Sequence, residues 1–161
     1  MNQVVIISVE GFLTEGTDLR NSPPIQSSRI LFDTLKATYQ VVFLSTEPDQ
    51  VLVRSWLKKE HFLKYATVFC RPASSILTPV DWKMAQVREL QADGWSIAYF
   101  MDTDPQAVEA AFLEGLPSLL MASPHYARPE WRPDTTHAVR PWDTLVSTLE
   151  KENLLRVQEV S

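Results

Sequence analysis

The sequence predicts one α/β domain of three layers, doubly wound around a mainly parallel five-stranded sheet. Five short apolar segments alternate with four segments whose apolar residues recur at helical spacing, as in strands joined by helical crossovers. The 161 residues, 45% hydrophobic and 22% charged, suit one globular domain. We expect a single domain over 1–161, with its core at 3–122, a proline-rich loop at 123–141 and a final helix at 142–158.

The strands are predicted from runs that are too short for helices and rich in β-branched and aromatic residues. The runs are apolar at consecutive positions, which is typical of strands covered by helices on both faces. The predicted strands are residues 3–9, 40–45, 66–70, 96–101 and 117–121.

The connecting helices carry start and stop signals. The first two are predicted over 28–37 and 48–58. Thr78 and Asp104 each precede a proline, which suits a capping residue followed by proline at the first helical position. Gly115 stands where a left-handed residue ends the fourth helix. Residues 14–27, with two prolines and two serines, are expected to form a loop or flap.

Composition excludes several classes of function. Fifteen basic against twenty acidic residues give a net charge of −5, which argues against strong nonspecific nucleic-acid binding. One cysteine and three scattered histidines fit no disulfide or structural zinc site, and four glycines cannot form a dinucleotide-binding fingerprint. No apolar run is long enough to span a membrane, and the first residues lack a signal-peptide pattern. We therefore expect a cytoplasmic protein without a membrane partner.

Polar side chains gather where the predicted strands end. In parallel α/β sheets, ligands bind beside the carboxyl ends of the strands. The candidates there, together with a lysine from the third crossover, are Ser8, Glu10, Ser45, Thr46, Lys83 and Asp102.

This order resembles the haloacid dehalogenase (HAD)-like superfamily, in its capless part, and most closely the phosphatase domain of bacteriophage-type polynucleotide kinases. The resemblance spans about residues 3–122 and includes the acidic motif and following helix at 102–109. It implies an aspartate nucleophile, a carboxylate acid/base two residues later, a phosphate-binding hydroxyl and lysine, and a carboxylate ligand for Mg²⁺. These positions are held here by Ser8, Glu10, Ser45 with Thr46, Lys83, and Asp102, with Glu10 as a second, weakened metal ligand.

The first motif departs from the family pattern at three positions. Ser8 replaces the aspartate, and a serine hydroxyl without an identified base is a weak nucleophile. The change also removes an anionic Mg²⁺ ligand. Glu10 moves its carboxylate by one methylene, and Phe12 is bulky where a small residue is usual. The motif is therefore degenerate.

Two main hypotheses follow. The first is a phage-encoded HAD-like domain, acting in the host cytoplasm, that is catalytically impaired and binds a phosphorylated small molecule, a nucleic-acid end or a protein partner. The alternative is an active Mg²⁺-dependent phosphohydrolase acting on nucleotides or polynucleotide 3′-phosphate ends. A purely structural or interaction protein is a third.

Each candidate also has an ordinary structural interpretation. Ser8 would be a spare polar residue at a strand end, Glu10 a solvated loop carboxylate and Lys83 an exposed lysine, while Asp102 with Asp104, and Ser45 with Thr46, would start helices. The aromatic and arginine residues of loop 125–133 suit either packing over the sheet or single-stranded nucleic acid. An apolar stripe in the last helix suits intrachain core or a dimer contact; its members are Trp142, Leu145, Val146 and Leu149.

Overall fold

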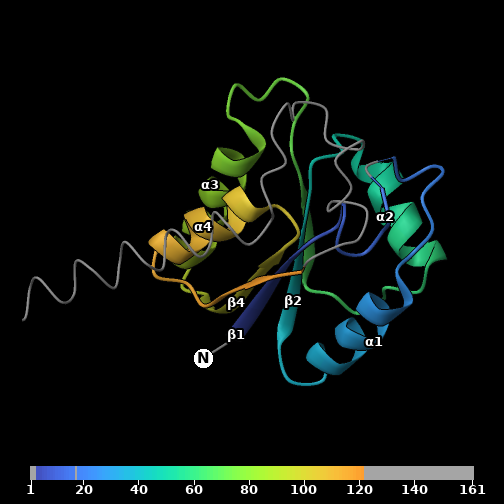
Figure 1. The fold of residues 1–161 in the computed structure, drawn as a ribbon, viewed down its shortest axis with the longest axis horizontal. Helices are drawn as coiled ribbons and strands as arrows, with labels where there is room; N and C mark the ends of the chain where they lie inside the picture. The colour runs from blue at the N-terminus through green and yellow to red at the C-terminus, as the bar shows by residue number, and fades with distance from the viewer. Residues whose placement is uncertain (1–2, 17, 122–161) are drawn as a thin grey trace, which may run out of the picture.

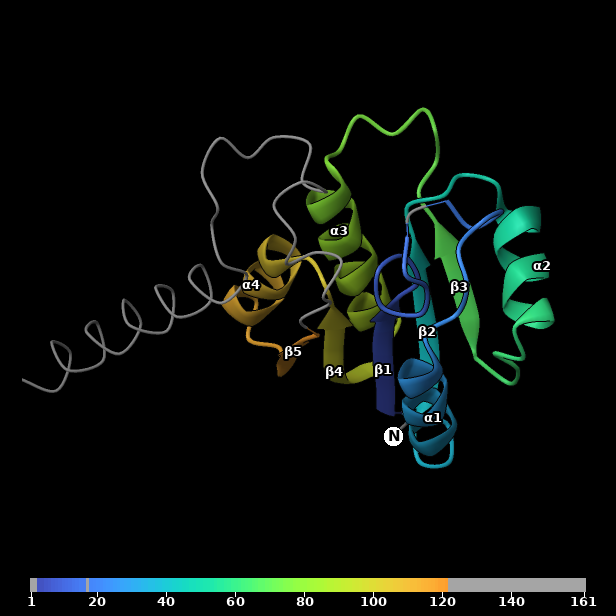
Figure 2. The ribbon, with the colours of Figure 1, turned by 45° about the vertical axis from the view of Figure 1, so that its right-hand side comes forward.

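A five-stranded parallel sheet forms the middle layer of the computed structural model, which describes residues 3–16 and 18–121. The strand order is β3-β2-β1-β4-β5 (Figure 2). The elements in chain order are β1 (Gln3–Ser8), α1 (Gln26–Leu35), β2 (Gln40–Ser45), α2 (Gln50–Lys59), β3 (Thr67–Cys70), α3 (Pro79–Ala92), β4 (Ser96–Asp102), α4 (Pro105–Leu113) and β5 (Ser118–Leu120). The predicted fold class is confirmed, and every strand pairing is parallel.

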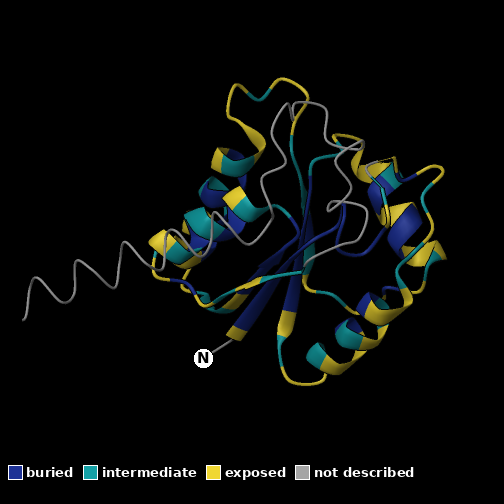
Figure 3. Ribbon diagram, in the orientation of Figure 1, coloured by how far each residue is buried: buried dark blue, intermediate teal, exposed yellow. Residues whose placement is uncertain are grey.

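Helices α1 and α2 cover one face of the sheet, and α3 and α4 cover the other (Figure 1). Successive side chains of a strand point to opposite faces. In β1, Val5 and Ile7 accordingly belong to the core cluster on the α1 and α2 side, and Val4 and Ile6 to the cluster on the α3 and α4 side. Figure 3 shows the buried central strands between the two helix layers. The continuous apolar run at the N-terminus thus serves two cores at once.

Three helices begin at capping side chains. Thr78 accepts a hydrogen bond from the Asp81 N–H and Asp104 one from the Gln106 N–H, as predicted. The cap of α2 is Asp49, which accepts from the N–H groups of Val51 and Leu52. The interpretation of Ser45 and Thr46 as a helix start is therefore wrong. Gly115 has φ +82°, the left-handed conformation expected after α4.

Several predicted boundaries shift by one or two residues. The first helix begins at Gln26, earlier than predicted, and α2 begins at Gln50, later than predicted, because Asp49 is its cap. At the sheet, β1 ends at Ser8 and β4 continues to Asp102. Both candidate residues are thus the last residues of their strands.

The topology brings the ends of β1 and β4 together. Strand β1 lies between β2 and β4, and the helices that follow β1 and β4, α1 after β1 and α4 after β4, lie on opposite faces of the sheet. The loops after β1 and β4 therefore diverge, which is the arrangement that leaves a ligand-binding crevice at a sheet edge. The register pairs Ile7 with Met101, so Ser8 and Asp102 end side by side.

The segment between β1 and α1 is a loop that is partly embedded. Isolated bridges join Thr14 to Glu10 and to Pro24, and Leu19 is buried in the core. Within 3–16 and 18–121, no helix has the length and apolar character needed to cross a membrane. The predicted loop 123–141 and helix 142–158 lie outside the described residues.

Candidate functional site at the strand ends

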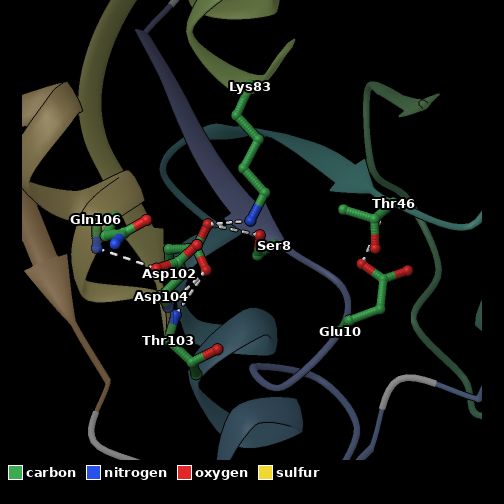
Figure 4. A network of polar contacts seen from close by, with 8 residues as sticks. All are labelled: Ser8, Glu10, Thr46, Lys83, Asp102, Thr103, Asp104 and Gln106. Atoms are coloured by element: carbon green, nitrogen blue, oxygen red, sulfur yellow. Dashed lines mark hydrogen bonds and ion pairs between the residues drawn. The ribbon is translucent and has the colours of Figure 1, made fainter. Parts of the chain in front are cut away.

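Asp102 is the centre of a buried cluster at the end of the central strands (Figure 4). Its Oδ2 accepts a hydrogen bond from Ser8 Oγ at 2.8 Å and from Lys83 Nζ at 2.6 Å. Only 1% of Asp102 and 5% of Lys83 is exposed. The interpretation of Lys83 as an ordinary exposed lysine is wrong, and Ser8 is a buried, bonded residue and not a spare polar group.

The second oxygen of Asp102 is also occupied. Oδ1 accepts from the Thr103 N–H at 2.7 Å and from the Asp104 N–H at 3.0 Å. Burial alone would lower the pKa of Lys83, but the charge and hydrogen bond of Asp102 outweigh it, so the pKa is raised above its ordinary value. Lys83 is therefore protonated, and the carboxylate and ammonium compensate each other.

Asp104 has a different role from Asp102. Its side chain caps α4, so the helix-cap interpretation is right for Asp104 and wrong for Asp102, which bonds no N–H of α4. Burial, followed by the nearby charge of Asp102, raises the pKa of the Asp104 carboxyl.

Glu10 belongs to a second group, formed with the end of β2. Ser45 Oγ donates to Glu10 Oε1, and the Thr46 N–H donates to Oε2 at 3.1 Å. The Glu47 N–H in turn donates to Ser45 Oγ at 3.2 Å. Glu10 is 7% exposed, so its interpretation as a solvated loop carboxylate is wrong.

The two predicted metal ligands do not converge. Figure 4 shows the Glu10 carboxylate turned toward Thr46, away from Asp102. Across the part of the chain that the structure describes, no three His, Cys, Asp or Glu side chains gather as a metal site. Mg²⁺ takes near-octahedral oxygen ligation, whereas both Asp102 oxygens are held by donors of the chain itself, one of them the cation Lys83. The residues in this arrangement do not fit a magnesium ion.

Two further side chains lie at this edge and were missed. Thr103 Oγ1 and Arg71 Nε are buried, with no hydrogen-bond partner among the described residues. Arg71 follows β3; its N–H donates to the Ser45 carbonyl, and its Nη2 donates to the carbonyls of Ser75 and Leu77. Arg71 directly follows the third predicted strand, as Thr46 follows the second, and this position in the sequence could have identified it.

Other features lie beside the site or away from it. Cys70 ends β3, and burial, followed by the charge of Glu10, raises the pKa of its thiol to about 11. Phe12, which is bulky where the HAD-like pattern has a small residue, is buried in the core cluster that contains Phe32. A pocket of about 500 Å³ lies at the start of β5, and Tyr99 is its one titratable lining residue. The other residues that line this pocket are uncharged and most are apolar, so the strand ends remain the candidate site.

Ser8 has an acceptor that sequence reasoning did not identify. Its hydroxyl donates to the carboxylate of Asp102, a residue 94 positions away. The same carboxylate oxygen also forms the ion pair with the Lys83 ammonium. The arrangement therefore combines a hydroxyl, a compensated carboxylate and a lysine. The catalytic and phosphate-binding roles of these residues stay predictions.

The fold is similar to that of chains in two solved structures of a Pnkp1/Rnl/Hen1 complex. A chain of a structure described as the Pnkp1/Rnl/Hen1 complex is similar over 75% of this chain, with TM-score 0.66 and 17% identity. A chain of the Pnkp1/Rnl/Hen1 RNA repair complex gives TM-score 0.62 and 18% identity over 75% of this chain. The matches cover 46% and 42% of those chains, so this chain spans less than half of either.

No protein-family model matches the sequence, and no curated protein sequence is significantly similar to it. At these identities the structural likeness establishes a shared α/β fold.

Proposed function

We propose that this chain is a HAD-like, phosphatase-fold domain that binds a phosphorylated ligand without the aspartyl-phosphate chemistry of that superfamily. The observation that carries the proposal is Ser8. The central strand ends in a hydroxyl bonded to Asp102, where covalent chemistry of the HAD type needs a free carboxylate nucleophile. The donors that remain at this edge then serve binding.

The donors at the sheet edge suit a phosphate monoester. The Ser45 hydroxyl and Thr46 N–H lie at the end of β2, and the buried ammonium of Lys83 bonds Asp102 at the end of β4. Hydrogen bonds from such groups to an ionised phosphate are strong because they are charge-assisted. Arg71 adds a guanidinium after β3.

The ligand is a phosphorylated nucleic-acid end or a phosphorylated small molecule. The likeness to chains of an RNA repair complex supports the nucleic-acid end. The net charge of −5 argues that the phosphate is recognised locally and not by a broad basic surface. A protein partner is the remaining candidate, and it applies if phosphate binding fails.

Binding is tested by thermal denaturation of the full chain with three probes: inorganic phosphate, a nucleoside 3′-monophosphate and a 3′-phosphorylated oligoribonucleotide. The matched control is the same oligonucleotide with a 3′-hydroxyl. A ligand that binds only the native state raises the Tm, so we expect a rise with phosphorylated probes alone. Equal shifts with the 3′-hydroxyl control, or none with any probe, would overturn the proposal.

A turnover assay with Mg²⁺ separates binding from catalysis. We expect no phosphate release by the wild type and measurable release by Ser8→Asp/Glu10→Asp, in which both family carboxylates are restored. Magnesium-dependent release by the wild type that disappears in Asp102→Asn would contradict the proposal.

That contrary result would support the second candidate, a Mg²⁺-dependent phosphohydrolase acting on nucleotides or polynucleotide 3′-phosphate ends. One observation favours it: the Ser8 hydroxyl already has a carboxylate acceptor for its hydrogen at 2.8 Å. The lack of a converging metal-ligand set among residues 3–16 and 18–121 is the observation against it.

A further inference from the structure

Glu10 holds two donors at the end of β2 with one carboxylate. One of its oxygens accepts from the Ser45 hydroxyl and the other from the Thr46 N–H. A phosphoryl group presents adjacent anionic oxygens in the same way, and it would be recognised by the same kind of donor pair. The carboxylate therefore lies where the bound anion is expected.

The Ser45 hydroxyl and the Thr46 N–H both donate their hydrogens to Glu10. Ser45 Oγ accepts from the Glu47 N–H, so its own hydrogen is available for Glu10. Ser45 is fully buried and has no access to solvent. The cap of α2 is Asp49, so the Thr46 N–H lies outside the helix and its capping bonds.

The charges of the site leave Glu10 without a cation. Lys83 forms its ion pair with Asp102, and within the described residues no ion pair involves Glu10. The Arg71 guanidinium at this edge donates to the carbonyls of Ser75 and Leu77. A phosphate dianion added to this site meets repulsion from Glu10 and finds its donors occupied.

From this geometry we propose that Glu10 is a resident anion, which a phosphoryl ligand must displace from Ser45 and Thr46 before it binds. The inference rests on the proposed function and concerns the regulation of the same site. Glu10 thus competes with the ligand, which is the opposite of the acid/base contribution that its position in the sequence suggests.

Calorimetric titration of inorganic phosphate into the full chain tests the competition. Glu10→Ala vacates the donors, and Glu10→Gln removes the charge with nearly unchanged shape. We expect Glu10→Ala to bind phosphate about tenfold more tightly than the wild type, the factor that one charge-assisted hydrogen bond contributes. Ser45→Ala added to Glu10→Ala should remove this gain, because it deletes one of the released donors.

Glu47→Gln is the matched control. It removes one negative charge from the same loop, and its side chain bonds the Asp49 N–H and not the phosphate donors. We expect its phosphate affinity to stay within about twofold of the wild type, since Glu47 is only partly buried and its charge is screened by water. An equal gain in Glu47→Gln and Glu10→Ala would assign the effect to general electrostatics and overturn the inference.

The remaining outcomes separate the inference from the proposed function. If the wild type binds phosphate and neither Glu10 variant binds it more tightly, the inference fails and the proposed function stands. Binding by the Glu10 variants alone supports the inference. If no protein binds phosphate, both fail. Circular dichroism of each variant verifies the fold, and the nearly isosteric Glu10→Gln keeps the test decisive if Glu10→Ala does not fold.

Discussion

Removing the charge of Lys83 tests whether its ion pair with Asp102 stabilises the strand ends. The two atoms are 2.6 Å apart, and their side chains are 7% and 1% exposed. Lys83→Met keeps the length of the side chain but leaves a buried carboxylate with only Ser8 and two backbone N–H groups as donors. Breaking a buried pair by removing one partner costs about 3–5 kcal/mol. We expect a loss of this size in the free energy of unfolding, measured with urea.

The matched variants are Asp102→Asn and the double change Lys83→Met/Asp102→Asn. Asp102→Asn should also destabilise, because it leaves the Lys83 ammonium buried without its counter-charge. The double variant should lose less than the sum of the single losses, since it contains no uncompensated charge. A loss in Lys83→Met below about 1 kcal/mol, or strictly additive losses, would refute a buried, coupled pair.

The raised pKa of Lys83 sets the pH range of this contribution. A lysine whose folded pKa exceeds its unfolded value of about 10.4 contributes fully below that value and loses its contribution as the pH rises through the folded pKa. The difference in stability between wild type and Lys83→Met should therefore be constant near neutrality and shrink only in alkaline solution above about pH 10.

Two more measurements address neighbouring residues. The Cys70 thiol, with a pKa of about 11, should react with iodoacetamide at pH 8 far more slowly than a free thiol, since its thiolate fraction is about a hundredfold smaller. Glu10→Gln should speed the reaction, because the charge of Glu10 raises the pKa of the Cys70 thiol. If the folded wild type reacted as fast as the urea-unfolded chain, the burial of Cys70 would be contradicted. Asp104→Ala should lower the free energy of unfolding by about 1 kcal/mol through loss of the α4 cap, and Asp104→Asn by much less. Equal losses in the two variants would argue against the cap.

The fold was predictable because its signals are local. A residue such as Ile6 lies in a run that is apolar at every position, which favours a strand with two covered faces. The caps Thr78 and Asp104 follow from the residue type and the adjacent proline. The cap of α2 was missed because Ser45 and Thr46 are also capping residue types, and only the geometry of the loop selects Asp49.

Most side chains of the candidate site were predicted, but Arg71, Thr103 and the pairings between side chains were not. Strand ends identify Ser8, Ser45 and Asp102, because the edge of a parallel sheet collects them. General tendencies place lysine and glutamate at the surface, and they fail for Lys83 and Glu10, which are buried against distant partners, Asp102 and Ser45 respectively. The bond between Ser8 and Asp102 joins residues 94 positions apart, and no local pattern in the sequence contains it.

The serine at the end of β1 explains why the two carboxylates have separate partners. A carboxylate at that position would share Lys83 with Asp102, whereas the Ser8 hydroxyl adds a donor and no charge. Lys83 then forms its ion pair with Asp102, and Glu10 bonds the neutral donors of Ser45 and Thr46. A ligand must therefore exchange existing hydrogen bonds for new ones, and such exchanges have a small net free energy. Weak phosphate binding by the wild type is thus expected, and the gain on removing the Glu10 charge is the more informative quantity.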